Sequence, residues 1–246
     1  MELRILFVII ARGGSKGVPR KNITMVGNLP LIAYKIISVK KCKYSYRLIV
    51  STDDDEIANV ARQYGAEVPF MRPDYLASDT ASSMDVVDHA IKWIETNDTN
   101  KYDYVCMLEP SSPFLTGEDL NNALDLLISK DADTLLGMKE VEVSRKFIHT
   151  LDANGGLSLF YEEIKSMTTI RRQDQQPEYT MNGCIYAAKW DYFKEKHLFH
   201  SVNSVPYIMP VEKSIEVDSM IDLEYARFVI EKGLVDISDW KHGVLI

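Results

Sequence analysis

What this sequence has little of sets the first limits on the protein. It contains only three cysteines in 246 residues, Cys42, Cys106 and Cys184, and they are widely separated and lie in or beside apolar runs. An odd number of scattered cysteines favours buried thiols in a reducing compartment over a disulfide framework or a zinc site. We therefore expect a cytoplasmic protein.

Long apolar runs and an excess of basic residues are also missing. No apolar run reaches the roughly 18 residues that cross a membrane, and no early stretch resembles a signal peptide. The formal net charge of −8 argues against a nucleic-acid surface. No repeat, low-complexity tract or linker marks a boundary, so we expect residues 1–246 to form a single domain that binds neither membrane nor nucleic acid.

A glycine-rich, basic turn follows the first apolar run. Residues 5–10 are six consecutive apolar residues, typical of a strand that is buried on both faces of a parallel sheet. Gly13, Gly14 and Gly17 follow, and their backbone amides can approach an anion closely. The cations of the same turn are Arg12, Lys16, Arg20 and Lys21. The turn predicts a polyphosphate site; the alternative is a solvated turn without a ligand.

The spacing of the glycines excludes two common phosphate loops. It fits neither the Walker A pattern nor the Rossmann pattern G-x-G-x-x-G. The run from Ala11 to Asn22 instead closely resembles a signature of the acylneuraminate cytidylyltransferases, the CMP-sialic acid synthetases, which attach a sugar acid to CMP. The nucleotide-binding residues that this resemblance and the segment described next imply are Arg12, Gly13, Gly14, Ser15, Lys16, Lys21, Asn22, Arg72 and Ser82.

Residues 53–55 and 71–83 follow predicted strands at 47–52 and 66–70. The triplet of aspartates at 53–55 could hold a metal, but we favour helix capping for Asp54 and Asp55 and leave Asp53 open. The pattern Arg72-Pro73-x-x-Leu76-Ala77-x-Asp79, with Ser82, resembles a nucleotide-contacting segment of the family. A helix N-cap built from residues 79–83 is the alternative, and both interpretations can hold together.

The turn at residues 109–115 contains two prolines, which force an irregular path after a strand at 102–108. The pattern Leu108-x-Pro110-x-Ser112-Pro113 resembles the family, which commonly has Gln at the position of Glu109. A carboxylate lacks the amide donor and adds charge, so the recognised sugar acid can differ. Alternatively, Glu109 binds a metal or points away.

The second half of the chain carries an Asn-Gly hairpin signal and two further family-like motifs. Asn154 and Gly155 indicate a hairpin, and the resemblance implies that residues 140–175 form an insertion through which the protein makes a homodimer. Residues 170–186 resemble the family's second signature, in which Arg172 suits the carboxylate of a sugar acid; an incidental arginine pair in a surface loop is the alternative. The implied sugar-binding residues are Glu109, Ser112, Arg172, Gln173 and Asn182.

Alternation along residues 215–218 places Glu216 and Asp218 on one face of an extended segment, where they could share Mg²⁺. The family pattern has two aspartates there, so Glu216 departs from it. A helix cap describes Ser219 and Asp222 better than it describes Asp218.

Together with the resemblance, these elements predict a three-layer α/β/α fold with a mostly parallel sheet, of the Rossmann-like nucleotide-diphosphosugar transferase type. The expected reaction joins CTP to a nine-carbon 2-keto sugar acid of the sialic, legionaminic or pseudaminic type, with release of diphosphate. Lys21, Arg12 and Asp218 are the expected catalytic residues. The alternatives are a CMP-Kdo-type synthetase and a non-catalytic nucleotide-sugar binding protein.

Overall fold

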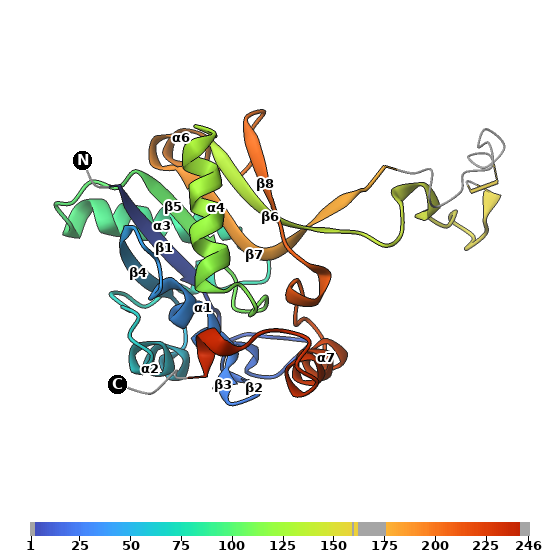
Figure 1. The fold of residues 1–246 in the computed structure, drawn as a ribbon, viewed down its shortest axis with the longest axis horizontal. Coiled ribbons are helices and arrows are strands. Elements are labelled where there is room, and N and C mark those ends of the chain that lie inside the picture. Colours follow the sequence, from blue (N-terminus) through green and yellow to red (C-terminus); the bar gives the residue numbers. More distant parts are fainter. Residues whose placement is uncertain (1–2, 159, 162–175, 242–246) are drawn as a thin grey trace.

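The computed structural model describes residues 3–158, 160–161 and 176–241. These residues form a six-stranded sheet with the order β4-β1-β5-β7-β6-β8 (Figure 1). Its strands are β1 (Arg4–Ile10), β4 (Ser45–Ser51), β5 (Tyr104–Leu108), β6 (Thr134–Glu140), β7 (Tyr179–Lys189) and β8 (Ser204–Ile208). Only β7 runs against its neighbours β5 and β6, while the other adjacent strands pair in parallel. The mostly parallel sheet is therefore confirmed.

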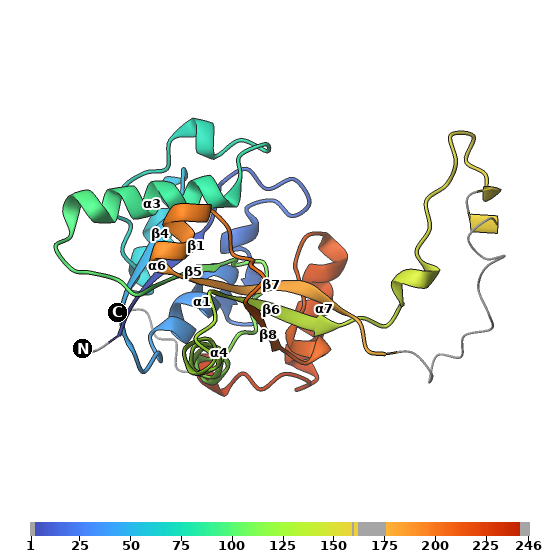
Figure 2. The same cartoon turned by 90° about the horizontal axis from the view of Figure 1, so that it is seen from above.

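Helices cover both faces of the sheet, which confirms the three layers (Figure 2). α3 and α6 pack on one face and α1, α2, α4 and α7 belong to the core on the other. Their bounds are α1 Leu31–Val39, α2 Asp55–Gln63, α3 Ser83–Asn97, α4 Gly117–Ser129, α6 Trp190–Lys196 and α7 Met220–Glu231. Short elements are β2 Met25–Val26, β3 Leu29–Pro30, η1 Lys21–Ile23, η2 Asp74–Leu76, η3 Arg145–Phe147, η5 Val211–Lys213 and η6 Ser238–Trp240. Within the described ranges no helix is long and apolar enough to span a bilayer.

The central strand β1 explains why its sequence is apolar without interruption. Ile5, Phe7 and Ile9 join the core under α1, whereas Leu6 and Val8 join the core under α3, and all five are fully buried. Burying one such side chain stabilises a fold by about 1.5–3 kcal/mol. The strand therefore fixes the position of the turn that follows it.

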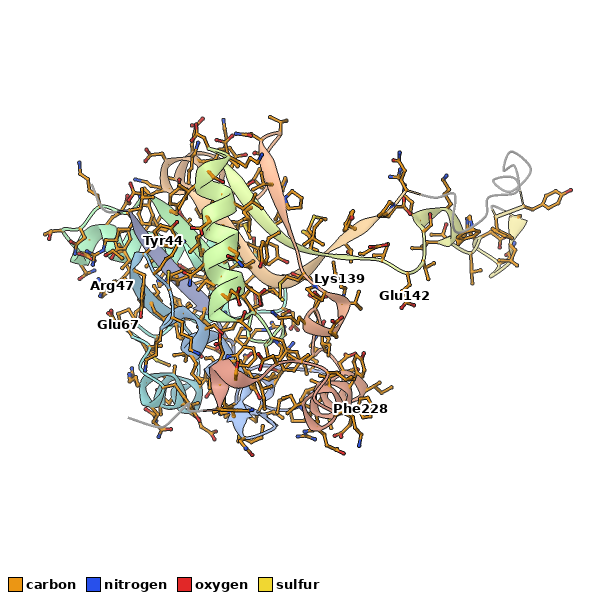
Figure 3. All side chains as sticks on the ribbon, in the orientation of Figure 1. Tyr44, Arg47, Glu67, Lys139, Glu142 and Phe228 are labelled. Carbon is orange, nitrogen blue, oxygen red and sulfur yellow. The ribbon has the colours of Figure 1, made fainter. Side chains whose placement is uncertain are left out.

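The strand predicted at residues 66–70 is wrong. Glu67 forms only an isolated parallel bridge with Ile49 of β4. Its side chain is held by Arg47, whose Nη2 donates to Glu67 Oε2 at 2.7 Å (Figure 3). Pro69 has no N–H to donate, so the pairing stops after one bridge. The sheet consequently ends at β4.

An arm leaves the sheet between β6 and β7. The two strands pair antiparallel as far as Glu140 and Tyr179, and the described residues that follow β6 and precede β7, 141–158 and 176–178, project away from the core, with Lys139 at the base of the arm and Glu142 on it (Figures 1 and 3). The predicted turn is present, because Gly155 has φ +76° and its N–H donates to the Asp152 carbonyl at 2.9 Å. Residues 141–158 contain no strand, so the antiparallel pairing that supports the arm comes from β6 and β7 instead.

Candidate active site

A cavity of about 430 Å³ opens beyond the carboxyl ends of β1 and β5. This edge is where open α/β sheets bind their ligands. The lining residues come from four stretches of the chain: Ile10, Arg12, Ser15, Lys16, Gly17, Lys21 and Asn22; Arg72, Leu76, Ser78, Asp79, Ala81, Ser83 and Val86; Glu109, Pro110 and Ser111; and Asp218. The predicted phosphate turn and Asp218 of residues 215–218, the predicted acidic segment, thus line the same cavity.

The backbone of the first turn is fixed by polar contacts within the turn and with the segment after β4. Buried Asn22 donates from Nδ2 to the Arg12 carbonyl at 2.9 Å, and the Gly13 N–H donates to Asp53 Oδ1 at 2.9 Å. A β-carbon on Gly17 would lie 1.9 Å from the Asp218 carbonyl oxygen. Gly17 therefore allows the turn to pack directly on the acidic segment.

The capping interpretation of Asp54 is confirmed. Its Oδ1 accepts the Ile57 N–H at 2.9 Å at the start of α2, and Arg20 binds the same carboxylate through two nitrogens at 2.5 and 2.9 Å. Arg20 also contacts Glu56. These contacts lower the pKa of Asp54, with the Arg20 hydrogen bond as the main cause. Asp53, which the sequence left open, supports the turn through Gly13.

The cations that face the cavity are paired as well. Asp79 binds Arg12 at 2.9 Å and Lys16 at 2.5 Å, and Lys21 Nζ lies 2.8 Å from Asp218 Oδ1. Arg20 does not line the cavity, whereas Arg12, Lys16 and Lys21 do. The four basic residues of the turn therefore divide into one structural arginine and three cations that line the cavity, each paired with an aspartate.

The segment 71–83 is anchored at both ends. Arg72 is 6% exposed and donates from Nε to Ser51 Oγ at 3.1 Å and from Nη2 to the Ser51 carbonyl at 2.5 Å. Burial lowers the pKa of Arg72 to about 10. At the other end Ser82 caps α3 by accepting the Met84 N–H at 3.1 Å. Arg72 lines the cavity. Ser82 does not, although its neighbour Ser83 does.

Oxygen atoms from three residues converge around Gly183, which has φ +66°. A β-carbon built there would lie 2.5 Å from Glu216 Oε1, 2.6 Å from Ser112 Oγ and 3.2 Å from Glu109 Oε2. Ser112 is fully buried, and its hydroxyl has no hydrogen-bond partner among the described residues. Burial, and then the charge of Glu216, raise the pKa of Glu109 to about 7. Glycine therefore leaves room for a compact group of oxygens beside the cavity.

The predicted metal ligands flank a buried valine. The Val217 N–H donates to the Ser111 carbonyl at 2.8 Å, which holds the segment extended with Glu216 half-buried and the Asp218 side chain 73% exposed. Burial, and to a smaller extent the charge of Asp218, raise the pKa of Glu216. In the described part of the chain no three His, Cys, Asp or Glu side chains are grouped to hold a metal. Two carboxylates nevertheless fit Mg²⁺, which commonly takes one or two together with substrate phosphates.

Asn182 of the second signature, residues 170–186, is buried in the fold, unlike the cavity-lining residues of the first signature, residues 11–22. Asn182 is fully buried and does not line the cavity; its Nδ2 donates to Ser214 Oγ at 3.0 Å and its Oδ1 accepts the Cys184 N–H at 3.1 Å. Its amide therefore shapes β7 beside Gly183. Arg172 and Gln173 lie outside the described residues.

Sequence reasoning missed one buried charge. Lys35 of α1 is fully buried, and its Nζ donates to the Cys184 carbonyl at 2.7 Å. Burial lowers the pKa of Lys35, and the charge of Glu109 acts in the opposite direction. Lys35 lies within an apolar helical pattern, so only the fold reveals that its charge is close enough to influence Glu109.

A sheet covered on both faces, with a cationic glycine turn and carboxylates around one cavity at its carboxyl edge, defines a nucleotide-binding α/β protein. Comparison with known proteins narrows this class. The chain belongs to the cytidylyltransferase family, whose model matches residues 6–213. It is accordingly a nucleotidyltransferase.

Relatives match the chain over nearly its full length. The post-translational flagellin modification protein B of Campylobacter coli is 32% identical over 96% of this chain and 99% of its own. The pseudaminic acid cytidylyltransferase of Campylobacter jejuni is 32% identical (92% and 96%). The CMP-N,N'-diacetyllegionaminic acid synthase of Legionella pneumophila is 30% identical (93% and 97%). A solved CMP:2-keto-3-deoxy-manno-octonic acid synthetase complexed with CTP has a TM-score of 0.67 at 14% identity, covers 94% and 99% of the two chains, and shows the shared fold.

Proposed function

We propose that this protein joins CTP to a nine-carbon 2-keto sugar acid and releases diphosphate. The observation that carries the proposal is that Lys21 of the first turn and Asp218 line the same cavity and lie 2.8 Å apart. The pseudaminic acid cytidylyltransferase and the CMP-N,N'-diacetyllegionaminic acid synthase support this class of acceptor.

The first turn provides the triphosphate site in this proposal. Arg12, Lys16 and Lys21 bind phosphate oxygens, assisted by backbone amides of the glycine turn. Lys21, which adjoins Asp218, neutralises charge at the α-phosphate. The anomeric hydroxyl of the sugar acid forms a bond to the α-phosphorus and gives up its proton to solvent, while the bond from phosphorus to the bridging oxygen breaks and diphosphate leaves. Alignment and charge neutralisation supply the catalysis, without a covalent enzyme intermediate.

Asp218 and Glu216 are the proposed ligands of Mg²⁺. When bound, Mg²⁺ would supply positive charge to the triphosphate. Both carboxylates would hold the ion, and Asp218 also keeps Lys21 oriented towards the cavity, as its 2.8 Å contact with Lys21 supports. Glu109 and Ser112, whose side-chain oxygens converge at Gly183, are proposed to contact the sugar acid. The sugar-binding roles of Arg172 and Gln173 stay predictions.

The arm supports the proposal of a homodimer. It exposes large apolar side chains at Val143, Phe147, Ile148, Leu151 and Leu157. Exposed apolar surface of this kind commonly packs on another protein, and we propose that it packs on a second copy of the chain. Light scattering on the purified protein should give twice the chain mass.

The free cysteines Cys42, Cys106 and Cys184 are compatible with the proposed cytoplasmic location.

Diphosphate release tests the reaction. CTP and Mg²⁺ are supplied with sialic, legionaminic, pseudaminic and Kdo acids in separate reactions, and a reaction without sugar acid is the control. Release with at least one nine-carbon acid, above the control, is the expected result. Faster release with Kdo would identify an eight-carbon acceptor. CTP binding without release for any acid would instead indicate a binding protein.

A further inference from the structure

Asp79 holds two of the cations that face the cavity. Its two carboxylate oxygens bind Arg12 Nη1 at 2.9 Å and Lys16 Nζ at 2.5 Å, and Asp79 itself lines the cavity. Arg12 Nη1 also reaches the Ala77 carbonyl at 3.5 Å. The hydrogen bond from Lys16 is the main cause that lowers the pKa of Asp79, which is therefore ionised. An anion of the protein thus lies between two cations that a polyphosphate would need.

The other acidic partner of the turn differs in its surroundings. Asp54 binds Arg20 outside the cavity and also caps α2, so the carboxylate is tied into the fold. The Asp79 side chain is 49% exposed, and its polar contacts within the described residues are those with Arg12 and Lys16. Because nothing in the described structure fastens it elsewhere, Asp79 can leave these cations without disturbing a helix.

Carboxylate and phosphate oxygens bind arginine and lysine in the same way. A triphosphate that used Arg12 and Lys16 would bring several negative charges next to Asp79, and like charges at this distance repel. We propose that Asp79 is a resident anion which occupies the polyphosphate-binding cations and must be displaced when the triphosphate enters. Asp79 consequently weakens nucleotide binding. The triphosphate as ligand rests on the proposed function.

Binding of inorganic tripolyphosphate, measured by titration calorimetry, tests this role without base or sugar. Asp79→Asn keeps the size of the side chain and removes its charge, and we expect it to tighten the Kd for tripolyphosphate roughly three- to tenfold. Asp85→Asn is the matched control, because Asp85 is exposed at the start of α3 and does not line the cavity. This control should leave the Kd unchanged, and both variants should unfold at the wild-type temperature.

Cytidine provides the second arm of the experiment. It carries no phosphate, so its Kd should be the same for the wild type and Asp79→Asn. Unchanged or weaker tripolyphosphate binding by Asp79→Asn would overturn the proposal, as would an equal change for cytidine or no tripolyphosphate binding by either protein. A protein that binds tripolyphosphate yet releases no diphosphate with any sugar acid would fail the proposed reaction while leaving the role of Asp79 intact.

Discussion

The first turn and the segment around Gly183 were both predicted as ligand sites, but they are built in different ways. The turn supplies six of the residues that line the cavity, all between Arg12 and Asn22. Around Gly183 the oxygens come from Glu109, Ser112 and Glu216, while the adjacent Asn182 is buried in a hydrogen-bond network. One local motif thus supplies several residues of a binding surface, whereas the second region is assembled only from distant segments.

Removing the cation that joins the two regions should have the largest effect. Lys21→Ala is expected to lower kcat at least about 100-fold, because it removes charge stabilisation at the reacting phosphate, and to leave the fold intact. Lys101→Ala, which changes an exposed lysine outside the cavity, is the control and should keep wild-type activity. Steady-state rates of diphosphate release measure both. Equal activity of the two variants would remove Lys21 from the catalytic group.

Two glycines of the first turn allow a sharper comparison. Gly17→Ala should lower the free energy of unfolding by about 1–3 kcal/mol, because the new methyl group would overlap the Asp218 carbonyl. Gly14→Ala should change it by less than about 0.5 kcal/mol, since no heavy atom beyond its chain neighbours lies within 4 Å of the added carbon. Urea unfolding of both variants checks this. Equal stabilities would contradict the packing of the turn on the acidic segment.

A substitution at Asn182 tests whether this residue stabilises the fold or contacts the sugar acid. Asn182→Ala should cost about 1–2 kcal/mol of stability, because Ser214 and the Cys184 N–H would lose a buried partner. At a temperature where the variant is folded, its KM for the sugar acid should stay near the wild-type value. Unfolding curves and KM are measured on the same preparation. A raised KM at unchanged stability would instead support direct sugar contact.

The last prediction is a pH dependence at Glu109. Its pKa is raised from the ordinary 4.5 to about 7, so the folded protein favours the protonated form. This contribution to stability is complete below about pH 4.5 and is lost as the pH rises through about 7. Glu109→Gln lacks this titration and should gain about 2–3 kcal/mol over the wild type between pH 5 and pH 8. Urea unfolding at both pH values provides the test; a constant difference would contradict the shift.

Much of the fold was predictable because its signals are local. The six apolar residues of β1, the cap at Asp54 and the cap at Ser82 are read from neighbouring residues, and each is present. The strand expected at 66–70 failed because strand formation depends on a pairing partner, and Pro69 limits that pairing to one bridge. The same reasoning could not separate Arg20 from Arg12, since their roles depend on which acidic side chain each one meets.

The sequence by itself determined the buried first strand, the glycine-rich cationic turn and the alternation that leaves Glu216 and Asp218 on one side of an extended segment. Only the tertiary structure decided that Lys21 meets Asp218, that Asp79 occupies Arg12 and Lys16, and that Lys35 is buried near enough to influence Glu109. The physical reason is the range of the forces. Backbone geometry and capping act within a few residues, whereas charge pairing depends on distances in space between segments far apart in the chain, as for Lys21 and Asp218, which are 197 positions apart.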